Sequence, residues 1–298
     1  MVSCAFDIKM PTAEKMWQSL SDNRPDMIFF TGDTAYADYV DFTGGELGRW
    51  KRYVDSRLSL RLYRMRILIP TFAIWDDHDY GINNGDKTFD LRQAMFEMFE
   101  LFWRPQEVSG YKKTFGVGFE FSGFGQKFCF MDNRSYRDLR YGNGYHWGSD
   151  QQELLLAGLD QSETPAWILS GSQHFGCYKV EESFMLDHPK NFVDFLQKLA
   201  KVKSPVVFGS GDVHFSEVMK LEPQLLGYQS YEFTSSSMHS FTSPHFELFK
   251  NARRQNFTWK HNYLLIESTR VGMGLQISTT SYGINRDKYF SHQATVSR

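Results

Sequence analysis

The 298-residue sequence has few cysteines, no long apolar segment and little net charge. Cys4, Cys129 and Cys177 are too few and too far apart for a disulfide framework or a paired-cysteine zinc site. No apolar run approaches the roughly 20 residues of a transmembrane helix. The formal charge of -2 gives no general attraction to polyanions. We therefore expect no stable nucleic-acid or membrane partner.

The first residues lack the basic and apolar regions of a secretory signal peptide. We expect either an intracellular protein or one whose leader has been removed, so the sequence leaves the compartment open. With 41% hydrophobic residues, the chain can bury a large core. We predict a single domain over residues 1–298.

Apolar runs alternate with amphipathic segments along the first hundred residues. Buried strands are predicted at 2–6, 27–31 and 71–75, and helices at 12–21, 46–65 and 87–103. This alternation predicts a parallel or mixed sheet with crossover helices.

From residue 114 onward the pattern favours more strands. An antiparallel hairpin is predicted over 116–132, followed by helices at 149–161 and 189–201, strands at 166–170 and 206–210, and a β-rich tail from 217 to 289. Two β-rich halves with helices outside them predict an α/β fold in which two stacked sheets are covered on both outer faces.

Three strands end abruptly in clusters of polar residues. These segments are FFTGDTAYADY at 29–39, TFAIWDDHDYGINN at 71–84 and VVFGSGDVHFSEV at 206–218. A buried strand that ends this way delivers polar side chains to one rim of a sheet. Carboxylates and imidazoles brought together there most often bind metal, so the three segments predict a hydrolytic metal site.

In the first segment, one turn of backbone can bring Asp33 and Tyr36 to the same ion. A carboxylate can bridge two hard cations, and a phenolate favours ferric iron over calcium or magnesium. The alternative interpretation is an exposed turn with a structural tyrosine.

In the second segment, Asp77 and His78 point to opposite sides if the chain is extended, so one can bind metal while the other faces a substrate. A solvated acidic loop is the alternative. In the third segment, Asp212 and His214 would share a face. Cys4 is either a small core residue or a thiolate ligand for ferric iron beside Tyr36.

Together, SCAF, GDTAYAD, WDDHDxxxNN, MDNRSYRD and SGDVHFSEV resemble the alkaline phosphatase D family of the calcineurin-like and purple-acid-phosphatase-like metallophosphoesterases. The resemblance runs in the family's order from Cys4 to about Val218. It implies a four-layer α/β/β/α sandwich of two mixed sheets. It also implies that residues 1–298 form the catalytic domain alone, without the immunoglobulin-like domain that precedes it in many members.

The resemblance implies a two-metal centre at the strand ends. Asp33 would bridge the ions, and Cys4, Tyr36 and His214 would complete the site of a ferric ion. Asp77 and Asp212 would bind the second cation. Their hard oxygen ligands favour Ca²⁺, with zinc, manganese or magnesium as alternatives.

By the same resemblance, His78 faces the substrate, and Asp79 orients its ring or adjusts its pKa. Asn83 or Asn84 either adds an amide ligand or forms a turn. Arg134 clamps phosphate oxygens, or else forms a salt bridge with Asp132 or Asp138. Gln173 occupies a polar position near the site, and His174 either reaches metal or substrate or is structural.

The implied activity is hydrolysis of phosphate esters, as a phosphomonoesterase with phosphodiesterase activity. Metal-bound hydroxide would attack phosphorus while His78 protonates the leaving alkoxide, and phosphate would be product or inhibitor. A phospholipase-D-like phosphodiesterase is the second enzymatic hypothesis. A non-catalytic, metal-dependent binding protein on the same fold is the third, since fold alone does not guarantee turnover.

Overall fold

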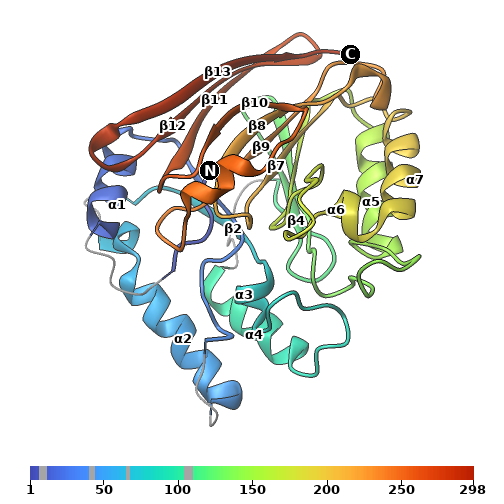
Figure 1. Ribbon diagram of the computed structural model, residues 1–298. Coiled ribbons are helices and arrows are strands. Elements are labelled where there is room, and N and C mark those ends of the chain that lie inside the picture. Colours follow the sequence, from blue (N-terminus) through green and yellow to red (C-terminus); the bar gives the residue numbers. More distant parts are fainter. Residues whose placement is uncertain (7–11, 40–43, 65–67, 104–109) are drawn as a thin grey trace.

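The computed structural model describes residues 1–6, 12–39, 44–64, 68–103 and 110–298 as a mixed α/β fold (Figure 1). The helices with at least ten residues are α1 (Ala13–Asp22), α2 (Gly45–Ser59), α4 (Arg92–Trp103), α5 (Ser149–Asp160) and α7 (Pro189–Leu199). One-turn helices are α3 (Asp77–Tyr80) and α6 (Phe184–Asp187), with 3-10 turns at Arg61–Arg64, Pro223–Leu225, Pro244–Leu248 and Ile284–Arg286. None of the described helices is long and apolar enough to cross a membrane.

The largest sheet has eight strands in the order β10-β8-β9-β7-β6-β5-β4-β3. Its strands are β3 (Lys112–Lys113), β4 (Phe119–Gly123), β5 (Gln126–Phe130), β6 (Ala166–Leu169), β7 (Val206–Ser210), β8 (Ser216–Lys220), β9 (Tyr231–Thr234) and β10 (Arg254–Thr258). The central strands β5, β6, β7 and β9 are parallel, and both flanks are antiparallel. The predicted hairpin and mixed sheet are therefore confirmed.

Two smaller sheets are joined through the first residues. The parallel pair contains β1 (Ile28–Thr31) and β2 (Thr71–Ile74), and the antiparallel sheet contains β11 (Tyr263–Val271), β12 (Gly274–Tyr282) and β13 (Lys288–Val296). Met1 exchanges backbone hydrogen bonds with Leu264 of β11, and Val2 bridges Phe30 of β1. Met1 and Val2 therefore link the three-stranded sheet to the β1–β2 pair.

Phenylalanine rings pack the β1–β2 pair against the large sheet. The ring centroid of Phe29 lies 5.1 Å from that of Phe128 and 5.2 Å from that of Phe130, while Phe72 stacks on Phe121 at 4.4 Å. Aromatic side chains bury large apolar areas and favour these edge and offset contacts. The core between the two layers therefore fixes how the ends of β1 and β2 face those of β5 and β7.

Amphipathic helices cover the outside of the layers. In α7, Pro189 occupies the first turn, where the absence of its N–H costs no hydrogen bond, and Phe192, Phe195, Leu196 and Leu199 form the buried face. Helices α5 and α7 lie together on one side of the molecule, and α1 and α2 lie on the other (Figure 1). The helices predicted at 12–21, 149–161 and 189–201 are confirmed within two residues at each end.

Three predictions of secondary structure were wrong in detail. Residues 2–6 form only an isolated bridge at Val2, because the chain turns at Cys4, whose φ is 53°. The helix predicted at 46–65 ends at Ser59 and is followed by a 3-10 turn, and the helix predicted from residue 87 begins at Arg92. Pro105, expected just beyond that helix, lies outside the described residues.

Candidate metal centre

The three predicted strand ends meet at one rim of the fold. Asp33 follows β1, Asp77 follows β2, and Asp212 follows β7. Asp76, Asp77 and Asp212 each offer an oxygen atom within 4.8 Å of the others. The fold therefore brings together residues that were predicted from apolar runs ending in polar clusters.

Two further groups of potential ligands overlap this one. Cys4, Asp33 and His214 offer ligand atoms within 4.8 Å of one another, as do Asp33, Asp77 and His78. The Cys4 thiol lies 3.4 Å from Asp33 Oδ2. Because Asp33 and Asp77 each belong to two groups, the arrangement suits neighbouring cations that share carboxylates.

The backbone at these positions is unusual. Cys4, Asp33, Asp212 and His214 all have φ between 53° and 68°, in the left-handed region that costs a non-glycine residue about 1–2 kcal/mol. Asp212 and His214 therefore lie in a turn and not on the extended face that we expected. Gly32 precedes Asp33 because a Cβ there would lie 2.6 Å from Asp76 Cβ.

Several buried oxygen atoms of the centre have no hydrogen-bond partner among the described residues. They are Asp33 Oδ1, Asp76 Oδ2 and Asp212 Oδ2. Burial, together with neighbouring carboxylates, raises the pKa of Asp33 and Asp212 well above the usual range. An unpaired buried carboxylate is costly, and a bound cation would neutralise it and use its free oxygen. The residues therefore fit metal ions.

The donor types differ across the centre. On one side are the Cys4 thiol and the His214 imidazole, with Asp33 between them, and on the other are carboxylates alone. Sulfur and nitrogen ligands suit a transition metal, whereas an all-oxygen set suits a hard cation such as Ca²⁺. Tyr36 is buried, and its hydroxyl donates to Ser240 Oγ at 3.0 Å while its ring stacks on His78.

Asp38 is the carboxylate that orients His78. Its two oxygens lie 2.8 and 2.9 Å from His78 Nδ1. Although burial alone would lower the pKa of His78, Asp77, Asp33 and Asp38 raise it to about 11. Asp38 was not among the predicted site residues, although it lies in the same GDTAYAD segment as Asp33.

Asp79 does not hold the place that we expected beside the His78 ring. The chain begins the short helix α3 at Asp77, so the Asp79 side chain turns back toward the preceding turn. It accepts hydrogen bonds from Thr34 N and Oγ1, Ala35 N and Asp76 N. Asp79 therefore holds the Asp33 loop against α3.

Arg134 is fully buried in an ion-pair network. Its guanidinium bonds to Asp76 Oδ1 and to Glu182 Oε2, the latter at 2.6 Å. Arg137 continues the network to Glu182 and Asp187. The predicted ion-pair partners of Arg134 were wrong: Asp132 accepts the backbone N–H of Arg134 and not its guanidinium, and Asp138 pairs with Lys87. The guanidinium of Arg134 already donates to the carboxylates of Asp76 and Glu182 and to the carbonyl of Gly85, so a phosphate-binding role remains a prediction.

The remaining predicted site residues do not belong to the three donor groups, and one of them contacts such a group through its backbone. Gln173 Nε2 donates to Glu217 and Thr234, and His174 Nδ1 contacts Glu232. Gln173 and His174 are at most 1% exposed, within a polar network of the large sheet. The exposed Asn84 donates its backbone N–H to Asp77 Oδ2 at 2.8 Å, which supports its predicted turn role.

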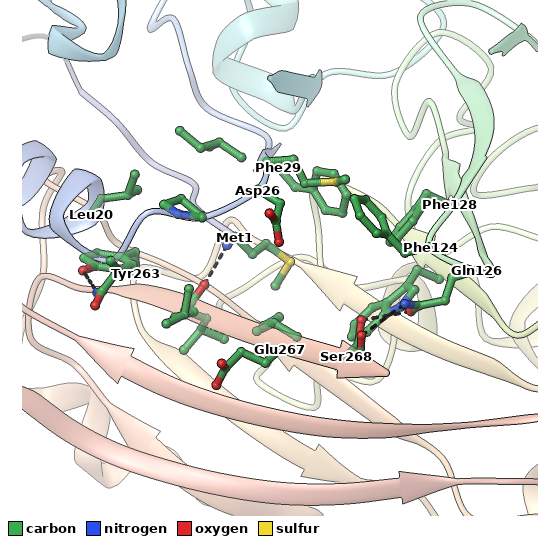
Figure 2. Close-up of a pocket in the computed structure, with 18 of the residues that line it drawn as sticks. Met1, Leu20, Asp26, Phe29, Phe124, Gln126, Phe128, Tyr263, Glu267 and Ser268 are labelled. Atoms are coloured by element: carbon green, nitrogen blue, oxygen red, sulfur yellow. Dashed lines mark hydrogen bonds between the residues drawn. The ribbon is translucent and has the colours of Figure 1, made fainter. Parts of the chain in front are cut away.

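A cavity of about 370 Å³ lies at the opposite ends of the strands (Figure 2). Its walls come from the starts of β1, β5 and β6 and from β11, including Phe29, Phe128, Trp167 and Tyr263. None of the predicted site residues lies among the described residues that line it. The candidate centre and this cavity are therefore separate features.

Comparison with solved structures supports the fold. The chain is similar to a structure described as "Structure of PhoD", with a TM-score of 0.70 and 18% sequence identity over 99% of this chain and 67% of that one. No family model matches the sequence, and no curated protein matches it. The resemblance to alkaline phosphatase D is thus confirmed as a likeness of fold along the described chain.

Proposed function

We propose that this protein is an alkaline phosphatase D-like hydrolase of phosphate esters, a phosphomonoesterase with phosphodiesterase activity. The observation that carries the proposal is the overlap of three ligand groups through Asp33 and Asp77. This overlap suits a pair of neighbouring cations, the arrangement that clamps the phosphoryl group in many phosphatases. The likeness to a PhoD structure supports the same reaction class. We include in the proposal a single catalytic domain with the four-layer α/β/β/α arrangement.

Cys4, Asp33, Tyr36 and His214 would hold Fe³⁺, and Asp77 and Asp212 would share Ca²⁺ with Asp33. Zinc, manganese or magnesium are alternatives for the second ion. When bound, the pair would supply Lewis-acid polarisation of the phosphoryl group and an acidified water. The unpartnered oxygens of Asp33 and Asp212 support these assignments.

His78 would protonate the leaving oxygen of the ester. Asp38 engages Nδ1, so a protonated ring presents its second N–H from Nε2. The stacked ring of Tyr36, 4.2 Å away between centroids, limits rotation of the imidazole. A positioned acid of this kind contributes about 10²–10⁴-fold to the rate.

The proposed ligands and acid act on the phosphoryl group, so phosphate monoesters and diesters fit them alike. Phosphate would act as product and inhibitor. Gln173 and His174 are buried in a polar network of the large sheet, and Arg134 is buried against Asp76 and Glu182, which favours a supporting role for these three side chains over direct contact with the substrate.

The test is hydrolysis of an aryl and an alkyl phosphate monoester, and of an aryl diester, by protein reconstituted with Fe³⁺ and Ca²⁺. An EDTA-treated sample is the control, and elemental analysis gives the metal content. We expect metal-dependent hydrolysis and a coloured protein, because phenolate and thiolate ligands absorb visible light when bound to ferric iron. Bound metal without hydrolysis of any ester would favour the non-catalytic binding protein. Absence of bound metal would overturn the centre itself.

His78→Ala tests the proton donor separately. Both metals should remain, while turnover of the alkyl ester falls more than that of the aryl ester, because an alkoxide leaves poorly without protonation. Asp38→Asn should also lower turnover of the alkyl ester more than that of the aryl ester, but by a smaller factor. Equal losses on both esters would count against an acid role for His78.

A further inference from the structure

Ser236 lies between two of the candidate iron ligands. Its hydroxyl oxygen is 3.0 Å from Cys4 Sγ and 2.9 Å from the backbone nitrogen of His214. The residue belongs to the loop after β9, more than 200 residues from Cys4 and within the tail where the sequence resemblance weakens. One fully buried hydroxyl thus joins Cys4 to His214.

The hydrogen-bond partners fix where the proton of this hydroxyl points. The N–H of His214 can only donate, so Ser236 Oγ accepts it. The one proton of the hydroxyl is then directed to Cys4 Sγ. The backbone of Ser236 is held as well, since its N–H donates to Ser216 Oγ and its carbonyl accepts from Ser216 Oγ and Asn262 Nδ2.

A second serine beside the same sulfur provides a matched comparison. Ser3 Oγ lies 3.3 Å from Cys4 Sγ, but its proton is donated to the carbonyl of Ser235 at 2.8 Å. Both serines are fully buried. Of these two hydroxyls, only that of Ser236 is oriented to donate to a Cys4 thiolate.

We propose that Ser236 is a positioning residue that donates a hydrogen bond to the metal-bound thiolate of Cys4 and adjusts its donor strength. The inference rests on the proposed assignment of Cys4 to iron. Hydrogen bonds to a ligating sulfur withdraw electron density from it and shift the reduction potential of the metal. Without the Ser236 hydroxyl, the thiolate donates more strongly and ferric iron becomes harder to reduce.

The test compares Ser236→Ala with Ser3→Ala after loading with Fe³⁺, using visible absorption, the ferric/ferrous potential and iron content. In Ser236→Ala we expect the sulfur-to-iron band to move to longer wavelength and the potential to fall. In Ser3→Ala both should match the wild type. Identical spectra for all three proteins, or equal shifts in both variants, would overturn the inference.

Ser236→Thr keeps the hydroxyl and should restore the wild-type band, which separates hydrogen bonding from loss of packing. A band in Ser236→Thr that matches Ser236→Ala would contradict the inference. Absence of any such band in the iron-loaded wild type would instead overturn the assignment of Cys4 to iron, on which the inference depends.

Discussion

Two groups of buried carboxylates lie next to each other and differ in the counter-charge available to them. In the ion-pair network, Glu182 and Asp187 face Arg134, Arg137 and Arg140. In the metal centre, Asp33 and Asp212 have no lysine or arginine within ion-pair distance in the described parts of the chain. The network carries its own counter-charges, whereas the centre has an excess of negative charge.

Asp76 belongs to both groups. Its Oδ1 accepts from Arg134 and from Asn133 Nδ2, while its Oδ2 has no partner in the part of the chain that the structure describes, and the side chain lies within reach of Asp77 and Asp212. The difference between the groups shows which carboxylates need a cation. Burial alone does not distinguish a ligand from a structural ion pair, but the availability of counter-charge and free lone pairs does.

The largest effect is expected from Asp33→Asn. Metal binding and ester hydrolysis should both be lost. The loss should exceed the 10- to 100-fold decrease that typically follows a change in a residue that only contacts a metal ligand. The thermal stability of EDTA-treated protein should stay level or rise, because the change removes an unpaired buried charge. Elemental analysis, ester assays and thermal unfolding measure these outcomes. A large loss of stability without metal would mean that Asp33 is structural.

Arg134→Met tests the ion-pair network by removing one of its positive charges. It leaves Asp76 and Glu182 without their main counter-charge, so the free energy of unfolding should fall by about 3–5 kcal/mol in urea titrations. Lys198→Met is the control, because its exposed pair with Asp194 contributes only about 0.3–0.5 kcal/mol. Equal effects of the two substitutions would contradict the comparison.

Calcium should stabilise the folded protein by binding to the candidate metal centre. At about 100 times its dissociation constant, Ca²⁺ should add about 2.7 kcal/mol to the free energy of unfolding of EDTA-treated wild type. Asp212→Asn should lose most of this gain, whereas Asp187→Asn should keep it despite a lower starting stability. Thermal unfolding across a calcium titration would show this, and a full gain in Asp212→Asn would remove that residue from the site.

The smallest effect is a pH dependence of the region beside the network. Burial lowers the pKa of His188 to about 4 and lowers that of His146 well below its usual range. Below about pH 6.5 the unfolded chain therefore binds more protons than the folded protein does. The free energy of unfolding should decline from there toward pH 4. The slope of stability against pH should be shallower in His146→Gln. An unchanged slope would show that other groups dominate acid unfolding.

The sequence predicted the strand ends well and their partners poorly. The ends of the apolar runs at Asp33, Asp77 and Asp212 can be recognised from the local pattern. Parallel strands then bring these ends to the same edge of the fold. The pairing of Arg134 with Asp76 spans 58 residues, and that of Cys4 with Ser236 spans 232. Such contacts depend on loop paths that no local pattern specifies.

Two predicted site residues show how contacts distant in sequence set the direction of a side chain. Asp79 was expected beside His78, but a single helical turn directs it to the Asp33 loop. For His174 a ligand role and a structural role were both open, and its Nδ1 contacts Glu232 on a strand distant in sequence, while its buried Nε2 has no partner among the described residues. In both cases a nearby buried partner, invisible in the sequence, decided the direction of the side chain.

The left-handed backbone at Cys4, Asp33, Asp212 and His214 has a consequence for directed evolution. Glycine adopts this conformation without the cost that a side chain incurs, so each of these positions offers a gain in folding stability when the ligand is lost. A library screened only for heat resistance would collect glycine there and discard the centre while improving the scaffold. Selection for turnover has to be applied in the same round.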